Sequence, residues 1–219
     1  MDETRPVRIL VLSDRVDDSV YSSAVVDKFG DVDLVIACGD LPFPYLEYVL
    51  TMLNVPLAYV PGNHDRPTHT SDGRTVQFPE GAINVDGRVV TVRLAGERCV
   101  TIVGFGGSMA YGGRRHQYTE SAMRGRALRV LPRLLWRRWA RGRGADLLVT
   151  HAPPQGIHDG QDRCHSGFRT FLTLIRWARP LYHLHGHIHP SYGIDIVPRR
   201  LNGTEIRNVY GTDVIEVEA

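Results

Sequence analysis

Short, continuous apolar runs that stop abruptly at polar residues are the feature of this sequence that most restricts its fold. They include RILVLS, LVIACG, LAYVPG, DLLVTH and LYHLHG. Runs this short and this apolar are typical of strands buried on both faces, as in parallel sheets covered by helices. Helical segments are predicted at residues 19–29, 43–53, 120–143 and 167–178, and strand–helix units in series imply parallel pairing.

The middle of the chain follows a different pattern. Asp86-Gly87 and Gly96-Glu97 separate β-rich runs in INVDGRVVTVRLAGERCVTIVGFGG, which predicts two antiparallel hairpins. Residues 194–217 are predicted to form a closing meander. Since no repeat, low-complexity segment or linker interrupts the sequence, we expect a single domain over residues 1–219. The expected fold class is α/β, a four-layer sandwich of two mixed β-sheets flanked by helices.

Residues that can bind metals follow several of the predicted strands. The strand ends carry Asp14, Gly39-Asp40, Gly62-Asn63-His64-Asp65, His151 and His187-Ile188-His189. Parallel strands deliver their carboxyl-terminal loops to one edge of a sheet, so these side chains are expected to converge. Imidazole is a common metal ligand, although alternating histidines can also form a polar stripe or bond to the backbone. Five strand ends with such residues favour a site over a set of turns and caps.

The composition restricts the class of protein and its compartment. Hydrophobic content of 42% and charged content of 23% are ordinary for a globular protein, and no apolar run approaches the ~20 residues that cross a bilayer. The three cysteines, Cys38, Cys99 and Cys164, form no C-x-x-C pair, and the N-terminus lacks the pattern of a signal peptide. We therefore expect a cytoplasmic protein. With a net charge of +2, nucleic acid is not expected as a partner, and without a spanning segment neither is a membrane.

The ordered set D…GD…GNHD…H…GHxH resembles the calcineurin-like metallophosphoesterase superfamily, and the resemblance covers nearly the whole chain. The segments YVPGNHD, LLVTHAPPQGIHD and RPLYHLHGHIHPSYG are especially similar to a subgroup of small, intracellular, single-domain members. A lone GHxH is a weak signal, whereas the full set in this order is a strong one. The resemblance implies the metallophosphatase-like fold and a phosphoric ester hydrolase that depends on two divalent metal ions.

The resemblance also implies a role for each motif residue. Asp14, Asp40 and His189 are expected to hold the first metal. Asp40, Asn63, His151 and His187 are expected to hold the second, with Asp40 bridging the two. His64 is expected to act as proton donor or charge stabiliser at the leaving oxygen, with Asp65 orienting it. Mixed oxygen and nitrogen ligands suit Mn, Fe, Zn or Ni, and the choice among them is left open.

The implied reaction is hydrolysis of a phosphate ester by a hydroxide that bridges the two metals. Compact members of the family without large insertions often resemble phosphodiesterases, so a phosphodiester is the favoured substrate, drawn from small-molecule or nucleotide phosphate esters. The alternative is a catalytically weak regulatory protein that binds a metal or a nucleotide on the same fold.

The first motif departs from the family pattern. Members usually carry D-x-H, whereas this chain has Asp14-Arg15-Val16, and valine cannot bind a metal. Asp17 or Asp18 could supply a substitute carboxylate, water could fill the position, or the first site could be lost. Because all second-site ligands and His64 are present, our hypothesis is an active enzyme whose first metal is held more loosely than its second.

A strongly basic segment follows at residues 124–143. Leu128, Leu131, Leu135 and Trp139 recur at helical spacing, which predicts a helix with an apolar face packed on the sheet and solvated arginines. The alternatives are a surface for an acidic partner, for the tail of an anionic substrate, or for nucleic acid. Elsewhere, His165 and Asp159 are expected to shape the substrate pocket or to cap a helix. His183 and His185 are expected to be buried residues of the strand and not ligands.

Overall fold

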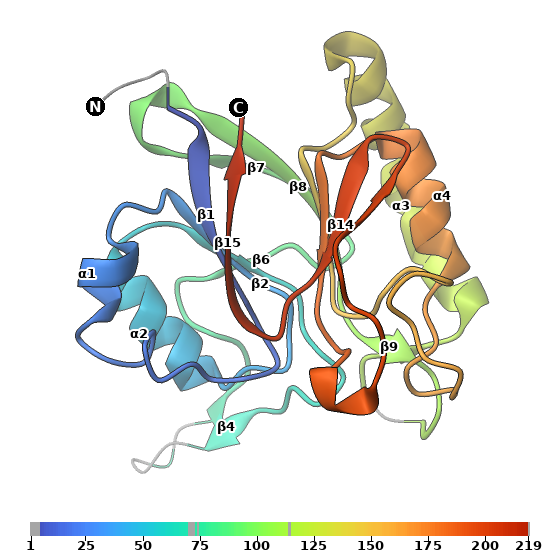
Figure 1. The fold of residues 1–219 in the computed structure, drawn as a ribbon. Coiled ribbons are helices and arrows are strands. Elements are labelled where there is room, and N and C mark those ends of the chain that lie inside the picture. Colours follow the sequence, from blue (N-terminus) through green and yellow to red (C-terminus); the bar gives the residue numbers. More distant parts are fainter. Residues whose placement is uncertain (1–4, 70–72, 74, 114, 219) are drawn as a thin grey trace.

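Two mixed β-sheets pack face to face in the computed structural model, with helices on their outer sides (Figure 1). The structure describes residues 5–69, 73, 75–113 and 115–218. The first sheet has the order β15-β1-β2-β3-β6 and the second β13-β14-β12-β11-β8-β7. Neighbouring strands from β1 to β6 are parallel, as are those from β14 to β8, and antiparallel strands close the remaining edges. This arrangement confirms the predicted four-layer sandwich.

The strands of the two large sheets are β1 (Val7–Ser13), β2 (Leu34–Ala37), β3 (Leu57–Tyr59), β6 (Ile83–Asn84), β7 (Val89–Arg93), β8 (Cys99–Phe105), β11 (Leu147–Thr150), β12 (Tyr182–His185), β13 (Arg199–Leu201), β14 (Thr204–Asn208) and β15 (Gly211–Val217). Two small pairs are β4 (Thr68–His69) with β5 (Thr75–Val76), and β9 (Ser108–Met109) with β10 (Gln117–Tyr118). The helices are α1 (Val25–Phe29), α2 (Phe43–Leu53), α3 (Glu120–Arg141) and α4 (Arg169–Ala178), with 3-10 turns η1 (Ala95–Glu97) and η2 (Pro190–Tyr192).

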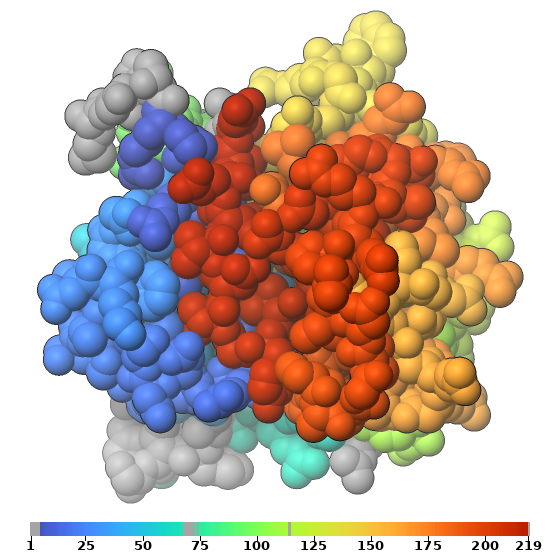
Figure 2. Space-filling view, viewed as in Figure 1, coloured from blue at the N-terminus to red at the C-terminus, as the bar shows by residue number. Residues whose placement is uncertain are grey.

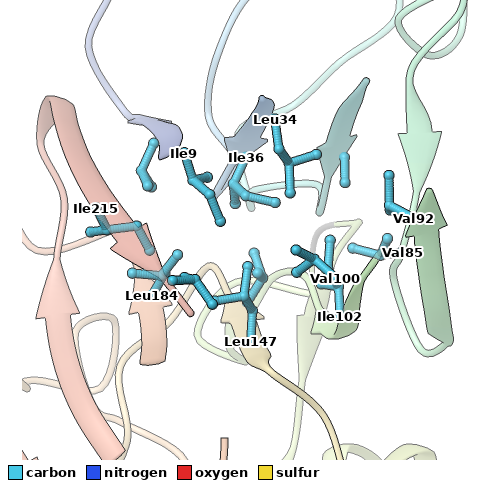
Figure 3. Close-up of a cluster of buried hydrophobic side chains, with 14 of the residues drawn as sticks. Ile9, Leu34, Ile36, Val85, Val92, Val100, Ile102, Leu147, Leu184 and Ile215 are labelled. Carbon is cyan, nitrogen blue, oxygen red and sulfur yellow. The ribbon is translucent and has the colours of Figure 1, made fainter. Parts of the chain in front are cut away.

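The core has three layers because successive strand residues face opposite sides of each sheet. Ile9 and Val11 of β1 join the cluster between the two sheets (Figure 3), whereas Leu10 and Leu12 pack outward against α2. A third cluster lies between the second sheet and helices α3 and α4, where Phe171 is fully buried. Both sheets are therefore covered on both faces, which explains the unbroken apolar runs in the sequence.

Two topological predictions are wrong. The hairpin predicted at Asp86-Gly87 does not form, because β6 pairs with β3 in the first sheet while β7 joins the second. The turn at Gly96-Glu97 does join the antiparallel strands β7 and β8 as predicted. The predicted closing meander is also divided between the sheets, since β14 pairs with β12 and β15 pairs with β1. In both regions the chain crosses between sheets, an event that local turn residues do not encode.

Helix α3 has the predicted extent but a different buried face. Its core contacts come from Met123, Ala127, Val130 and Leu134. The stripe predicted to pack on the sheet is largely exposed, with Leu128 54% and Trp139 85% exposed. The helix therefore carries two apolar faces, and only one of them is covered. None of the helices in the described part of the chain has the length and apolarity that crossing a bilayer requires.

Candidate functional site

The loops that follow five core strands meet at one end of the two sheets, at the bottom of Figure 1 where β4, β9 and the turn after residue 189 lie. Asp14, Asp40 and Asn63 come from loops of the first sheet. His151, His187 and His189 come from loops of the second sheet. The predicted metal ligands are thus brought together across the seam between the sheets, and the contacts described below join one sheet to the other.

Three of these residues leave the preceding segment through a left-handed backbone conformation. Asp14, Asp40 and His187 have φ angles of 60°, 55° and 70°. Positive φ is uncommon outside glycine and is tolerated best by short polar residues such as aspartate. It turns the chain sharply after β1 and β2, so the carboxylates point back across the ends of the strands instead of continuing along them.

His151 is the centre of the second ligand set. Its Nδ1 lies 2.8 Å from the Cys38 carbonyl oxygen, which can only accept, so Nδ1 carries the proton and Nε2 is left with a lone pair. That Nε2 lies 2.9 Å from Asn63 Oδ1 and 3.2 Å from Asp40 Oδ2. Three acceptor atoms converging on one point require either a cation or an added proton between them. The donor set therefore fits a divalent metal ion.

The electrostatics of this set are dominated by its charges. Burial of His151 opposes its protonation, but the Asp40 carboxylate outweighs burial and raises the pKa of His151 to about 9. Burial acts against ionisation of Asp40, yet the neighbouring His151 lowers the pKa of Asp40 well below its usual range. At neutral pH this places a proton on His151 Nε2, beside the Asp40 carboxylate. A metal ion bound in place of that proton would neutralise the Asp40 charge in the same way.

His187 completes the second set. Its Nε2 donates to the Cys164 carbonyl oxygen at 2.9 Å, which leaves Nδ1 free to bind a metal. One ligand atom from each of Asp40, His151 and His187 lies within 4.8 Å of the others. Burial and the neighbouring His151 lower the pKa of His187 to about 4, so the ring is neutral, as a ligand must be, at physiological pH.

Two motif glycines are required by close approach. A Cβ atom at Gly62 would lie 1.9 Å from Asp40 Oδ1, and one at Gly186 would lie 2.2 Å from Asp14 Oδ2. Both distances are far below any van der Waals contact. The G of GNHD and the G of GHxH therefore let the backbone pass directly beside the carboxylates.

The first ligand set is smaller and more open. Asp14 Oδ1 lies 3.4 Å from His189 Nε2, while Asp14 Oδ2 accepts bonds from Ser13 Oγ at 2.6 Å and from the His187 backbone N–H at 2.8 Å. The His189 ring stacks on Tyr192 with 4.9 Å between ring centroids. Its side chain is 32% exposed. This pair of ligands could hold a metal that completes its coordination from water or from Asp40.

No substitute for the missing histidine is assembled within the described residues. Val16 is partly buried and packs against the outer hydrophobic cluster that contains Leu10 and Leu12. Asp17 Oδ1 accepts the Ser19 backbone N–H at 2.9 Å, and Asp18 is exposed. Neither aspartate belongs to a group of three or more potential ligands. This geometry argues against a substitute carboxylate from Asp17 or Asp18, and water or loss of the first site are the two explanations that are left.

The expected proton donor and its neighbour adopt separate roles. The His64 backbone N–H donates to Asp40 Oδ1 at 2.7 Å, and the residue is exposed at the mouth of the site. Asp65 Oδ2 accepts the Gly62 N–H at 2.8 Å and thereby closes the GNHD turn. Burial and the nearby Asp40 raise the pKa of Asp65 to about 7. In the part of the chain that the structure describes, no hydrogen bond joins Asp65 to the His64 ring, so the expected orienting contact is replaced by a turn-closing one.

The loop before α4 and Tyr111 contribute further neighbours of the site, of which only His165 was expected from the sequence. Cys164 accepts the His187 bond through its carbonyl, and its thiol, His165 and His187 offer ligand atoms within 4.8 Å of one another. His165 is itself anchored to Asp162 at 2.7 Å. Tyr111 accepts a bond from Asn63 Nδ2 at 3.2 Å. A backbone carbonyl and a tyrosine hydroxyl carry no sequence signal, whereas Cys164 could have been singled out with its neighbour His165.

Two expectations near the site are resolved by the contacts. Asp159 accepts the backbone N–H groups of Gly156 and Gly167, so it stabilises its own loop. His183 and His185 are fully buried on β12, as expected. His183 Nε2 lies 2.8 Å from the Thr150 hydroxyl, and His185 Nε2 lies 2.9 Å from Nδ1 of the buried His158. These rings support the strand behind the ligands.

The sandwich and the ligand sets at its end define a class of protein. The sequence profile described as calcineurin-like phosphoesterase matches residues 7–191, and the chain belongs to that family. The fold agrees with that of TT1561 from Thermus thermophilus, with a TM-score of 0.61 and 16% identity over 93% of this chain and 88% of that one.

Two curated proteins of Caenorhabditis elegans match a shorter region. UPF0046 protein K07C11.7 is 37% identical over 51 residues, and UPF0046 protein T07D4.2 is 42% identical over 55 residues. The matched segments cover 22% and 23% of this chain but only 17% and 13% of the two worm proteins. The family is therefore established over most of the chain, whereas these relatives are matched over a small part of their own length.

Proposed function

We propose that this protein is a metal-dependent phosphoesterase that hydrolyses a phosphodiester of a small molecule or nucleotide. The single observation that carries the proposal is the convergence of His151 Nε2, Asn63 Oδ1 and Asp40 Oδ2 on one point. Either a proton on His151 Nε2 or a divalent cation would satisfy all three, and the presence of the His187 ring in the same group of potential ligands favours the cation. Membership of the calcineurin-like phosphoesterase family supports the same chemistry.

The proposal assigns a role to each of the motif residues at the site. Asp40, Asn63, His151 and His187 would hold one ion, and Asp14, His189 and a shared Asp40 would hold the other. Divalent ions bound there supply charge neutralisation of the phosphoryl oxygens and a water of lowered pKa. His64, on the open side, would donate a proton to the leaving oxygen, and its backbone N–H already fixes Asp40. Mn, Fe, Zn and Ni all suit these ligands.

The free state of Cys38, Cys99 and Cys164 supports the proposal that the protein works in a reducing compartment such as the cytoplasm.

The proposal can be tested with apoprotein reloaded with Mn²⁺ and assayed on bis-p-nitrophenyl phosphate. His64→Ala is expected to lower kcat by about 10²–10⁴-fold, the usual contribution of general acid catalysis, without loss of bound metal. Asn63→Ala is expected to lower both activity and metal content. Thr51→Ala, exposed on α2, is the control. Wild-type activity equal to that of the two variants would reject catalysis.

A second function is favoured by one observation: where the family usually has a histidine ligand, this chain has Val16, which packs against the outer cluster. On that basis the protein would be a regulatory module that binds a metal ion or nucleotide with little turnover. Tight metal binding by wild type and its loss in Asn63→Ala, together with background hydrolysis in both, would select this alternative.

A further inference from the structure

The C-terminal half of α3 carries an unusual surface. Figures 1 and 2 show this part of the helix (yellow) standing beyond the sheets at the top of the molecule. All three tryptophans of the chain, Trp136, Trp139 and Trp177, lie on α3 and α4 and are 62%, 85% and 38% exposed. Leu128 and Leu135 are exposed beside them. Tryptophan is mostly buried in globular proteins, so three exposed copies on two adjacent helices need an explanation.

The charged residues of α3 beyond Ser121 and those of α4 all have one sign. No acidic residue occurs between Ser121 and Ala145, or within α4. Arg129 and Arg133 are exposed and make no hydrogen bond or ion pair with any described residue, and the same holds for Arg124 and Arg141. In contrast, Arg138 donates to the α4 carbonyl of Trp177 and holds the two helices together. Part of the arginine content is thus structural, and part is left facing solvent.

We infer that this surface, defined by Leu128, Arg129, Arg133, Leu135, Trp136, Trp139 and Trp177 and called here the Trp–Arg face, binds the surface of an anionic lipid bilayer. The apolar residues from 128 to 139 recur on one side of the helix over about 17 Å, with arginines beside them. This is the pattern of a helix that lies in the headgroup region, with tryptophan and leucine at the acyl boundary and arginine on the lipid phosphates.

The exposed side chains distinguish this partner from two others. Nucleic acid uses arginine and stacked aromatics but gains nothing from exposed leucines, whereas acyl chains accept both. An acidic peptide would suit the cavity of about 450 Å³ between α3 and α4, which Leu128, Leu131 and Trp177 line. Trp136 and Trp139 project outside that cavity, so a peptide in it would leave the most exposed residues uncovered. A planar bilayer surface could cover Trp136 and Trp139, because this end of α3 projects beyond the sheets (Figures 1 and 2).

This inference revises the expectation of no membrane partner, which considered only segments that span a bilayer. It is independent of the proposed function. The ligand sets lie at the opposite end of the molecule from the projecting helix (Figure 1), so the bound protein would keep its site open to water.

The test uses the full chain with vesicles of phosphatidylcholine alone or mixed with phosphatidylglycerol. Wild type is expected to sediment with the anionic vesicles only, and its tryptophan emission is expected to shift to shorter wavelength. Trp136→Ser with Trp139→Ser should abolish sedimentation. Arg129→Gln with Arg133→Gln should weaken it by roughly thirtyfold, from the usual attraction of two charges to an anionic membrane.

Matched controls are Phe78→Ser, which removes an aromatic residue that is 61% exposed elsewhere, and Arg15→Gln, both expected to bind as wild type does. Failure of wild type to sediment with anionic vesicles overturns the inference, as does equal binding to neutral vesicles or wild-type binding by either double variant. Binding of a DNA duplex without any emission shift on vesicles would overturn it in favour of nucleic acid.

Discussion

The two ligand sets lie side by side at the same end of the molecule, yet they differ in enclosure. In the second set, Asn63 and His187 are each 5% exposed and His151 is fully buried, and each is held by a further hydrogen bond. In the first, His189 is one-third exposed, and the position where the family usually has a further histidine ligand is taken by the partly buried Val16. Because preorganised, buried ligands lose little entropy on binding, we propose that the enclosed set binds its metal more tightly.

The largest effect is expected where the two sets meet, at Asp40. Asp40→Asn removes the charge that both metals would share, so hydrolysis of bis-p-nitrophenyl phosphate should fall to background, more than ~10²-fold, and metal content by elemental analysis should fall in both sets. Asp27→Asn, an exposed change on α1, is the control. Retention of two metals by Asp40→Asn would contradict the bridging role.

The difference between the sets can be measured with one histidine from each. His187→Ala should weaken the tighter step of a Mn²⁺ titration by about 10–100-fold or more, since even outer partners of metal ligands contribute that much. His189→Ala should affect only the weaker step. Isothermal titration of the two apoproteins separates these outcomes. Two equally tight binding steps in wild type would contradict the proposal that the second ligand set binds its metal more tightly than the first.

Acid should lower the free energy of unfolding through the buried histidines behind the second ligand set. Burial, with His158 nearby, lowers the pKa of His183 to about 3. The unfolded chain takes up this proton at about 6.5, so the stabilisation is complete above pH 6.5 and is lost towards pH 3, at about 1.4 kcal/mol per unit. His183→Gln should flatten the fall in the apoprotein's free energy of unfolding in urea below pH 6.5. Thr51→Ala, an exposed change on α2 that removes no titratable group, should leave the slope as in wild type, and an unchanged slope in His183→Gln would refute the assignment.

The smallest effect is expected beside the open set. Asp17→Ala should leave metal stoichiometry unchanged, because the Asp17 carboxylate is engaged by Ser19 instead of the site. It should lower the free energy of unfolding by about 1 kcal/mol through loss of that hydrogen bond. Asp18→Ala, an exposed neighbour, should change neither quantity. A lost or weakened metal in either variant would restore the substitute-carboxylate explanation.

Much of this arrangement could be predicted because it is local. Apolar runs identified the core strands, and the polar residues at their ends identified the side chains that meet at the site. The contacts that fix those side chains were not predictable, since the Cys38 and Cys164 carbonyls that orient His151 and His187 belong to the backbone. The exposed stripe of α3 was misassigned because Leu128 and Leu135 have the same spacing as a buried face. Periodicity shows that a face exists and not which neighbour covers it.

The placement of the ligands on both sides of the seam has a mechanical consequence. Asp14 and Asp40 follow strands of one sheet and the histidines follow strands of the other. An ion bound by both groups would therefore link the two sheets at this end of the sandwich. At the opposite end, where β1 begins and β15 ends, apolar packing between the sheets continues to Val7 and Val217 and holds the sheets together there. A bound ion would add to the hydrogen bonds that already join the two sheets at the end where the ligands lie, from His151 Nδ1 to the Cys38 carbonyl and from the His187 N–H to Asp14.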